Sequence, residues 1–530
     1  MRAVLPYTPE TSVELGHGRA PAALVDVTRQ MLLGLGLAAL WLIVVDSLGA
    51  SVGYVVSKAG ASWGTTVAYG AGHVLGFGAL LALWRSSTLR RRLECAANGT
   101  LPALDRARGV LLLIALMTAV RLAWVFLVPT EPTSDNVVYH GLAKRLAEQG
   151  IYGNEKRAYW PPGYPFFLAG VYAVFGPSWL VAKLANVVLA GLGDVLTWTA
   201  VRVHAGTRAA ALALVLVVAW PWRTLHVDVL SYDALTVALV LASLALIPRR
   251  GRNLSARATW LRWVAAGVAL GLAVLVRPTL VLIPLAVFGW LVVRGDGLRR
   301  AAGSTLVLGL AALVPIVPWS IRNCAALHAF VPLTTNAGGN FYNSWAPGGT
   351  GGFYKPAWQT LEAAAGADER KLSALGFAMG IDTLRSDPLH ALRTAARKQV
   401  HYLGSDNWWL PVESYIAACD GHVRLGTGLK LVGHTLANAW FGLMLWLPLL
   451  MIRRVREVFA RQPLAWFSLA VFASGLLVHT VFEAQARYHL IYTPFWSILI
   501  ALLLEPRAAT ASGWSGRAGF DIKRHPAPAD

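Results

Sequence analysis

The sequence predicts an all-α polytopic membrane protein, and three observations lead to that prediction. Of the 530 residues, 56% are hydrophobic and only 14% are charged, which is too apolar a composition for a single soluble core. Apolar runs of about 17–25 residues, each long enough to cross a bilayer, recur along the chain. Basic loops alternate with loops that carry few cations, as the positive-inside rule predicts for a multispanning protein.

Taken in order, the apolar runs predict about 12 transmembrane helices. These lie at residues 31–48, 66–84, 110–128, 179–201, 209–225, 230–248, 260–276, 278–294, 303–319, 431–452, 464–482 and 488–504. The first run follows a polar leader, so we interpret it as a retained span and not as a signal peptide. The segment 163–176 is apolar but short, and we expect it to be re-entrant or interfacial.

Arginine clusters follow every second predicted span, so their loops are assigned to the cytoplasm together with both termini. The clusters lie at residues 85–108, 202–208, 249–262, 294–300 and 453–461. The long connections 129–178 and 320–430 are then external. Although the formal charge is +20, the cations are dispersed among the loops and form no single basic face. We therefore expect a bilayer, and no nucleic acid, as the partner of these charges.

This pattern divides the chain into five parts. They are a cytoplasmic leader with two extra spans (1–108), a membrane core with the external loop 129–178 (109–320), an external loop module (321–430), C-terminal spans (431–504) and a cytoplasmic tail (505–530). We expect juxtamembrane helices in the first external loop. Cys324 and Cys419 both fall in the second external loop, and a disulfide between them stays open because sequence does not establish their distance.

Asp135 is the first candidate for chemistry. The residues Val138, Leu142 and Leu146 follow it at helical spacing, which predicts an amphipathic helix along the membrane surface. Taken alone, an Asp beside Ser134 is more often a helix N-cap than a catalytic group. However, an acid on or near the buried face of a helix is costly unless it has a partner or a use.

Asp233 is the second candidate, with Asp228 nearby, at the outer end of a predicted span. The plain interpretation is again an acid in the first turn of a helix. Two acidic sites beside spans on the same face of the membrane nevertheless favour a common site.

Four arginines form the third group of candidates. Arg277, Arg322 and Arg487 lie at outer helix ends, and Arg121 lies inside the third predicted span, about two turns from its outer end. Outer positions run against the positive-inside bias. Snorkelling to lipid headgroups is the alternative explanation, and it suits Arg322 well and Arg121 poorly. Because the planar guanidinium suits a phosphate, the set predicts a site that is partly for an anion.

No metal site is predicted, because neither His-x-x-x-His nor Cys-x-x-Cys spacing occurs. Asp135 with His140 could assist a cation, which leaves a divalent ion open while no cofactor is certain. Five neighbours of the candidates are assigned supporting roles, namely Tyr139, His140, Asp228, Tyr488 and His489.

These segments together resemble the C-type (GT-C) integral-membrane glycosyltransferases, in particular the protein O-mannosyltransferases and lipid A aminoarabinose transferases. No single motif is specific, but their order and common side of the membrane carry the resemblance over about 110 to 500. The matching pieces are SDNVVYHGLAKRLAEQG, PPGYPFFLAGVYAVFG, Tyr232-Asp233, Arg277-Pro278, PWSIRNCAALHAFVPLTTNAGGNFY and ARYHLIYTPF. One departure is Trp160, which stands where some relatives carry a Lys or His.

The resemblance implies that a sugar moves from a polyprenyl-phosphate donor to a glycan, lipid or protein acceptor, with inversion at the anomeric carbon. Asp135 would be the general base, Asp233 would assist, and Arg487, Arg277 and Arg121 would bind the donor phosphate. We expect a bacterial plasma (inner) membrane and an active site on its external, periplasmic face. The rival class is a transporter or flippase, which predicts charges near the bilayer midplane and repeated halves.

Overall fold

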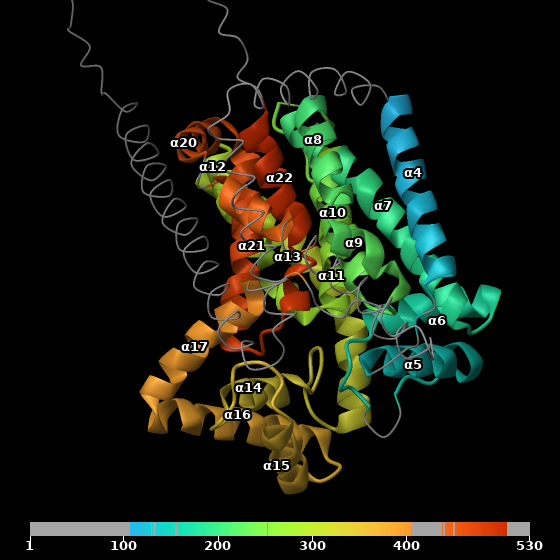
Figure 1. The fold of residues 1–530 in the computed structure, drawn as a ribbon, viewed down its shortest axis with the longest axis vertical. Helices are drawn as coiled ribbons and strands as arrows, with labels where there is room; N and C mark the ends of the chain where they lie inside the picture. Colours follow the sequence, from blue (N-terminus) through green and yellow to red (C-terminus); the bar gives the residue numbers. More distant parts are fainter. Residues whose placement is uncertain are drawn as a thin grey trace, which may run out of the picture.

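The computed structural model describes residues 107–505, apart from 129, 131–133, 154–156, 252, 404–405, 407–436, 438–439 and 449–450. Within this part of the chain the protein is all-helical, with no strand (Figure 1). The first two predicted spans, part of the tenth (431–436, 438–439 and 449–450) and Cys419 lie outside the described residues. Cys324 is a free thiol, and its pairing with Cys419 stays untested.

A bundle of apolar helices forms the body of the molecule. Its members are α4 (Ala107–Leu127), α7 (Trp179–Ala205), α8 (Thr207–Val218), α10 (Asp233–Leu246), α11 (Ala256–Val276), α12 (Ile283–Val293), α13 (Leu298–Leu327), α21 (Pro463–Val481) and α22 (Thr493–Leu504). Among the described helices, five are long and apolar enough to cross a membrane, or six if one bent pair counts as a single span. The prediction of a multispanning α-helical protein is confirmed, and the count of about 12 stays a prediction.

The bent pair coincides with the predicted span 209–225, which is not one straight helix. α8 ends at Val218 and the chain turns by 68° into α9 (Pro221–Leu225) and η1 (His226–Asp228), so the span is either broken or re-entrant. Pro221 explains the break, because proline has no backbone N–H and its ring excludes the carbonyl of the preceding turn. The turn brings the residues after it to the end of the bundle.

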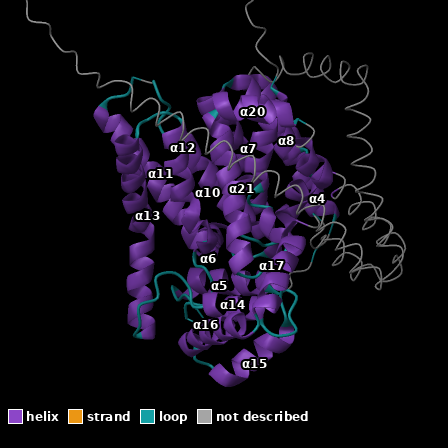
Figure 2. Cartoon of the chain, turned by 90° about the vertical axis from the view of Figure 1, so that its left-hand side faces the viewer, coloured by secondary structure: helices purple, strands orange, loops and turns teal. Residues whose placement is uncertain are grey.

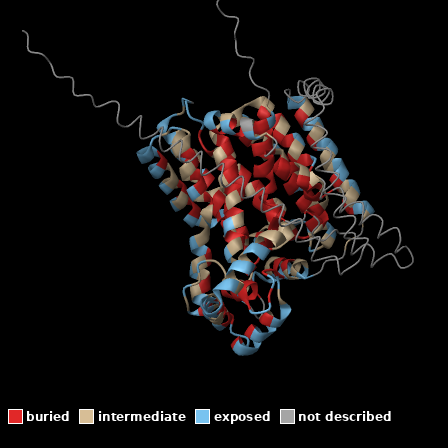
Figure 3. Ribbon diagram, turned by 60° about the vertical axis from the view of Figure 1, so that its left-hand side comes forward, coloured by how far each residue is buried: buried red, intermediate tan, exposed pale blue. Residues whose placement is uncertain are grey.

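The outer helices present their apolar side chains outward. Leu112 and Leu116 of α4, and Leu306 and Val314 of α13, are each at least 60% exposed. Buried residues instead concentrate inside the bundle (Figure 3). Almost every residue of α22 is buried. Exposed leucine and valine on two peripheral helices are typical of a surface that contacts lipid.

Close packing of α11 against α13 depends on two glycines. A Cβ at Gly267 would lie 2.3 Å from the backbone oxygen of Leu308, and one at Gly271 would lie 2.1 Å from that of Ala312. Their four-residue spacing is the small-xxx-small pattern that lets two membrane helices approach backbone to backbone. This pattern was present in the sequence but was not recognised there.

Two short helices lie at one end of the bundle, α5 (Asp135–Gln149) and α6 (Gly163–Phe175) (Figure 1). At 13 residues, α6 is too short for a hydrocarbon core about 30 Å thick. Leu142 of α5 is buried against Trp319 and Leu327 of α13, which confirms the amphipathic helix. α13 also continues to Leu327, eight residues beyond the predicted span.

The second long loop folds into four helices at the same end, which we call the loop module (residues 337–403) (Figure 2). They are α14 (Ala337–Trp345), α15 (Lys355–Ala365), α16 (Glu369–Ser386) and α17 (Pro388–Leu403). The buried Lys398 donates to the carbonyls of Thr480 and Val481, each at 3.1 Å, and its ammonium lies 3.3 Å from the centre of the Trp345 ring. These contacts attach the module to the end of α21.

Candidate active site

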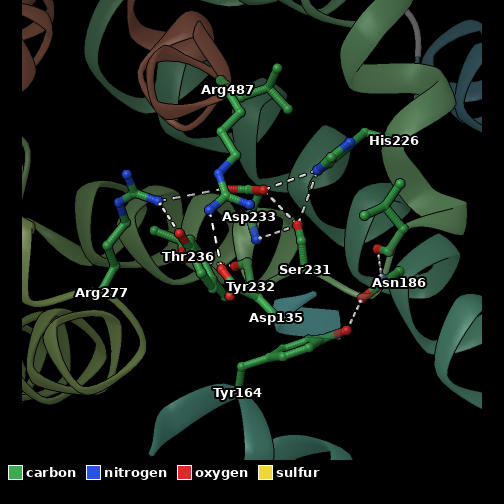
Figure 4. Close-up of polar contacts among 12 residues, drawn as sticks. Asp135, Tyr164, Asn186, His226, Ser231, Tyr232, Asp233, Thr236, Arg277 and Arg487 are labelled. Carbon is green, nitrogen blue, oxygen red and sulfur yellow. Dashed lines mark hydrogen bonds and ion pairs between the residues drawn. The ribbon is translucent and has the colours of Figure 1, made fainter. Parts of the chain in front are cut away.

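Residues from four segments that are distant in the sequence meet at one site (Figure 4). Asp135 begins α5, Tyr232 and Asp233 begin α10, Arg277 follows α11, and Arg487 lies on the 3-10 turn η3 (Ala486–His489). The Tyr232 hydroxyl lies within electrostatic range of all four charged groups. Four of the predicted site residues therefore share one site.

Asp135 forms an ion pair with Arg487 and is not the N-cap residue of α5. The cap position of α5 is Ser134, which makes no side-chain cap hydrogen bond. Ser134 also has a φ of 51°, a left-handed conformation that is uncommon for a residue other than glycine. The guanidinium Nη2 of Arg487 donates to Asp135 Oδ2 at 3.2 Å, and the two side chains stay 17% and 26% exposed. The N-cap alternative is therefore wrong, and the carboxylate borders accessible space.

Asp233 has a more enclosed set of partners. Its Oδ2 accepts hydrogen bonds from the Ser231 hydroxyl at 2.5 Å and faces His226 Nε2 at 3.1 Å, while Oδ1 lies 3.9 Å from Arg277 Nη1. The Asp233 residue is only 6% exposed. A carboxylate with this many donors is held in one orientation, which suits positioning better than proton transfer.

The two arginines of the site are held by aromatic rings. Arg277 Nη1 donates to the Tyr232 hydroxyl at 2.7 Å. The guanidinium carbons of Arg277 and Arg487 lie 4.8 Å and 5.1 Å from the centre of the same Tyr488 ring. Cation–π contact with this ring helps to stabilise both cations in a largely buried site. The site thus contains two planar cations, a group that suits the binding of an anion.

An aromatic wall borders the site. The ring of Tyr139 meets those of Trp160, Tyr164 and Tyr232 edge to face, each with centroids 5.8 Å apart. Burial, followed by the neighbouring Tyr232 and Asp135, raises the pKa of the Tyr139 hydroxyl, so it stays neutral. Apolar faces beside polar groups are typical of sites that bind rings bearing hydroxyls.

Glu483 also lies at the site, although sequence reasoning missed it. It stands between α21 and η3, is 7% exposed, and accepts a hydrogen bond from Gln485. Burial is the main cause that raises its pKa, and the repulsion by Asp135 adds to the same effect, while Arg487 opposes it. The only sequence signal was its position four residues before Arg487.

Arg121 lies in a different environment. Its Nη1 is 2.6 Å from Asp194 Oδ2, and both side chains are fully buried between α4 and α7. Arg223 approaches the same carboxylate at 3.6 Å and lines a cavity that also reaches His226 and Asp233. The structure thus does not place Arg121 beside the open Asp135–Arg487 pair, and its predicted contact with the donor phosphate has no support from this geometry.

Three other predicted residues have supporting positions. His140 bonds to the Tyr172 hydroxyl at 2.8 Å and stacks on Trp179, and burial is the main cause that lowers its pKa. His489 is fully buried, with Asp406 at 2.9 Å. Asp228 is 2% exposed at the end of η1, where its carbonyl accepts from Thr130.

No group of three or more His, Cys, Asp or Glu residues in the described part of the chain could hold a metal ion. Asp135 and His140 have their own separate partners, Arg487 and Tyr172. What the geometry offers is a partly exposed carboxylate, two adjacent guanidinium groups and an aromatic wall. Such a set can accept a proton on one side and stabilise an anion on the other.

Residues 160–321 match the family model described as dolichyl-phosphate-mannose-protein mannosyltransferase. The matched segment contains Trp160, Asp233 and Arg277 of the site. The match confirms the resemblance to the C-type enzymes, and together with the all-helical membrane fold it defines the class: the protein is similar to integral-membrane glycosyltransferases of the C type. A comparison with curated proteins gives no significant match.

Two solved structures are similar over most of the chain. The crystal structure of ArnT from Cupriavidus metallidurans bound to undecaprenyl phosphate is 18% identical, with a TM-score of 0.39, and the alignment covers 75% of this chain and 76% of that one. The Archaeoglobus fulgidus oligosaccharyltransferase, in complex with zinc and sulfate, is 14% identical, with a TM-score of 0.45 and coverage of 74% and 48%. TM-scores this low establish no residue-by-residue correspondence.

Proposed function

We propose that the protein transfers a glycosyl unit, a hexose or a pentose, from a polyprenyl-phosphate donor to a glycan, lipid or protein acceptor. The observation that carries this proposal is the open Asp135–Arg487 pair with Arg277 beside it. A base and an anion site within one cluster are what displacement at a sugar–phosphate bond requires. The family match over residues 160–321 supports the lipid-phosphate donor.

In the proposed reaction the acceptor oxygen attacks the anomeric carbon from the face opposite the phosphate. The new carbon–oxygen bond forms as the carbon–oxygen bond to phosphate breaks, and the electron pair leaves with the phosphate. Asp135 takes the proton of the acceptor hydroxyl. Arg487 and Arg277 stabilise the departing phosphate, and Asp233 holds Arg277 in place. The product has the opposite anomeric configuration.

The alternating arginine clusters support a site on the external face of a plasma membrane, as in a bacterial inner membrane. A donor dissolved in the bilayer would reach this cluster from the lipid, with no nucleotide sugar required on that side. A transporter or flippase is less well supported, because the charged residues of the site gather at one end of the bundle and not at its middle.

The test is a transfer assay with the full-length protein in lipid nanodiscs. Polyprenyl-phosphate hexoses and pentoses, labelled in the sugar, are supplied with an extract of cells that lack the gene. We expect one donor to lose its sugar to a component of the extract and to release polyprenyl phosphate. Movement of the intact donor between leaflets of a proteoliposome, with no cleavage of any donor, would instead establish the transporter class.

A further inference from the structure

Glu483 is fixed at the site from two sides through the backbone. Its own carbonyl accepts a hydrogen bond from His479 Nδ1 of α21 at 2.7 Å. The next residue, Ala484, donates its N–H to the Gly351 carbonyl of the loop module at 3.1 Å. The carboxyl is therefore held in place by a membrane helix and by the loop module together.

The side chain of Glu483 has one engaged oxygen and one available oxygen. Oε1 accepts from Gln485 and lies 3.5 Å from the Tyr488 hydroxyl. Oε2 makes no hydrogen bond with another described residue. The Glu483 residue as a whole keeps 7% of its surface exposed. Buried polar groups are normally hydrogen-bonded, so a buried carboxyl with one unbonded oxygen indicates a role beyond packing.

Glu483 lies beside the Asp135–Arg487 pair. Its Oε1 is 3.5 Å from the Tyr488 hydroxyl, the Tyr488 ring lies against the Arg487 guanidinium, and Arg487 pairs with Asp135. The charges of Asp135 and Arg487 both act on the Glu483 carboxyl. The site thus has two unlike halves. Arg277 and Arg487 both contact the Tyr488 ring in one half. In the other half the charges of Asp135 and Glu483 both act on the Tyr159 hydroxyl, whose ring packs edge to face on Trp160 of the aromatic wall.

The two halves suit different substrates. A lipid phosphate is stabilised by the two guanidinium groups, whereas an acceptor phosphate at the other half would meet two carboxyls. Like charges brought together in a poorly solvated site repel strongly. A neutral acceptor that carries several hydroxyls can instead donate hydrogen bonds to both carboxyls.

We propose that Glu483 is a positioning residue for the acceptor, and that the acceptor is a neutral, polyhydroxylated molecule and not a phosphate. Its Oε2 accepts a hydrogen bond from a hydroxyl next to the one that reacts, and so directs the reacting hydroxyl toward Asp135. This inference rests on the proposed transfer reaction and narrows it, since a hydroxyl acceptor needs the base that Asp135 supplies and a phosphate does not.

The first test uses the same nanodisc assay and treats the acceptor extract with alkaline phosphatase. We expect transfer by the wild-type protein to be unchanged by this treatment, because a neutral acceptor loses nothing. Loss of transfer after treatment would overturn the neutral class of acceptor. If the wild-type protein cleaves no donor with either extract, then the proposed function itself has failed, which is a separate outcome.

The second test compares Glu483→Gln with Glu148→Gln, an exposed acid of α5 that lies in an ion pair with Lys144. Losing a hydrogen bond to a charged group should raise the extract concentration at half-maximal rate about tenfold in Glu483→Gln. The donor concentration at half-maximal rate, the binding of undecaprenyl phosphate and the melting temperature should stay close to wild type. Glu483→Asp should recover part of the acceptor effect, and Glu148→Gln should be silent.

Two results would overturn the role of Glu483. If the acceptor and donor parameters and the melting temperature all worsen together in Glu483→Gln, the residue only holds the segment before η3. If none of them changes, the carboxyl contacts no substrate.

Discussion

Two of the arginine–carboxylate pairs in the described part of the chain differ in how far they are buried. Arg121 and Asp194 lie 2.6 Å apart with no exposed surface, whereas Arg487 and Asp135 lie 3.2 Å apart and stay 17% and 26% exposed. Both pairs balance charge in a largely apolar chain. Only the Arg487–Asp135 pair leaves room for another molecule. The Arg121–Asp194 pair is therefore structural, whereas Arg487 and Asp135 can exchange each other for a ligand.

The local backbone accounts for this difference. Arg121 and Asp194 project from the interiors of two long helices, α4 and α7, whose packing fixes their distance. Asp135 instead follows Ser134, with its φ of 51°, and Arg487 lies on a 3-10 turn of four residues. Short turns and strained residues concentrate at functional sites, where a side chain must face a ligand and not the protein interior.

The largest effect is expected for the partly exposed pair, Asp135 and Arg487. Asp135→Asn keeps the shape of the side chain and removes the proton acceptor, so transfer should fall by about 100- to 10,000-fold. Folding and binding of undecaprenyl phosphate should be retained, because the residue caps no helix and is partly exposed. The measurement is the initial rate in nanodiscs, with Asp233→Asn as the control for a carboxyl that only positions Arg277. A near-normal rate in Asp135→Asn would remove the base from the mechanism.

The next largest effect is expected for the fully buried pair, Arg121 and Asp194. Arg121→Leu leaves Asp194 buried with only Arg223 near it, which should lower stability by about 3–5 kcal/mol. Thermal melting in detergent should show this loss, and activity should fall only as far as the folded fraction falls. The double variant Arg121→Leu/Asp194→Leu should recover much of the stability, because replacing both charges by apolar groups is often nearly neutral. A stable but inactive Arg121→Leu protein would return Arg121 to the donor site.

A smaller effect is expected for the cation of the open pair. Arg487→Lys keeps the charge and loses the planar guanidinium and its stacking on Tyr488. Affinity for undecaprenyl phosphate should weaken about tenfold with an unchanged melting temperature. Arg461→Lys, at an exposed arginine of α20 (Ile452–Arg461), is the matched control. Equal affinity in both variants would show that Arg487 is only an interfacial anchor.

The convergence of Asp135, Asp233, Arg277 and Arg487 could be predicted from the sequence, and the reason is physical. Each is a charged residue at the same end of an apolar run, and such placements are costly unless the charges meet one another or a ligand. The alternation of basic loops then assigned them to one face. Helix periodicity predicted α5 equally well, since its buried leucines recur at regular spacing.

Other features of the site depend on distances that no local pattern carries. The pairing of Arg121 with Asp194 is one such feature, because the two residues lie 73 positions apart on different helices. Glu483 has no unusual neighbours in sequence and becomes notable only when α5 approaches η3. The break before Pro221 has a visible cause in the sequence, but the apolar run continues across it, so hydropathy alone does not reveal the break.

The length of α13 determines how far the two long loops lie above the membrane. Its 30 residues extend about 45 Å, roughly 15 Å more than the hydrocarbon core. The projecting turns hold both long loops, since Arg322 donates to the carbonyl of Tyr152, and Asn323 donates to that of Leu333. The length of α13 therefore sets the distance of the two loops from the hydrocarbon core. Inserting one helical turn would increase that distance by about 5.4 Å.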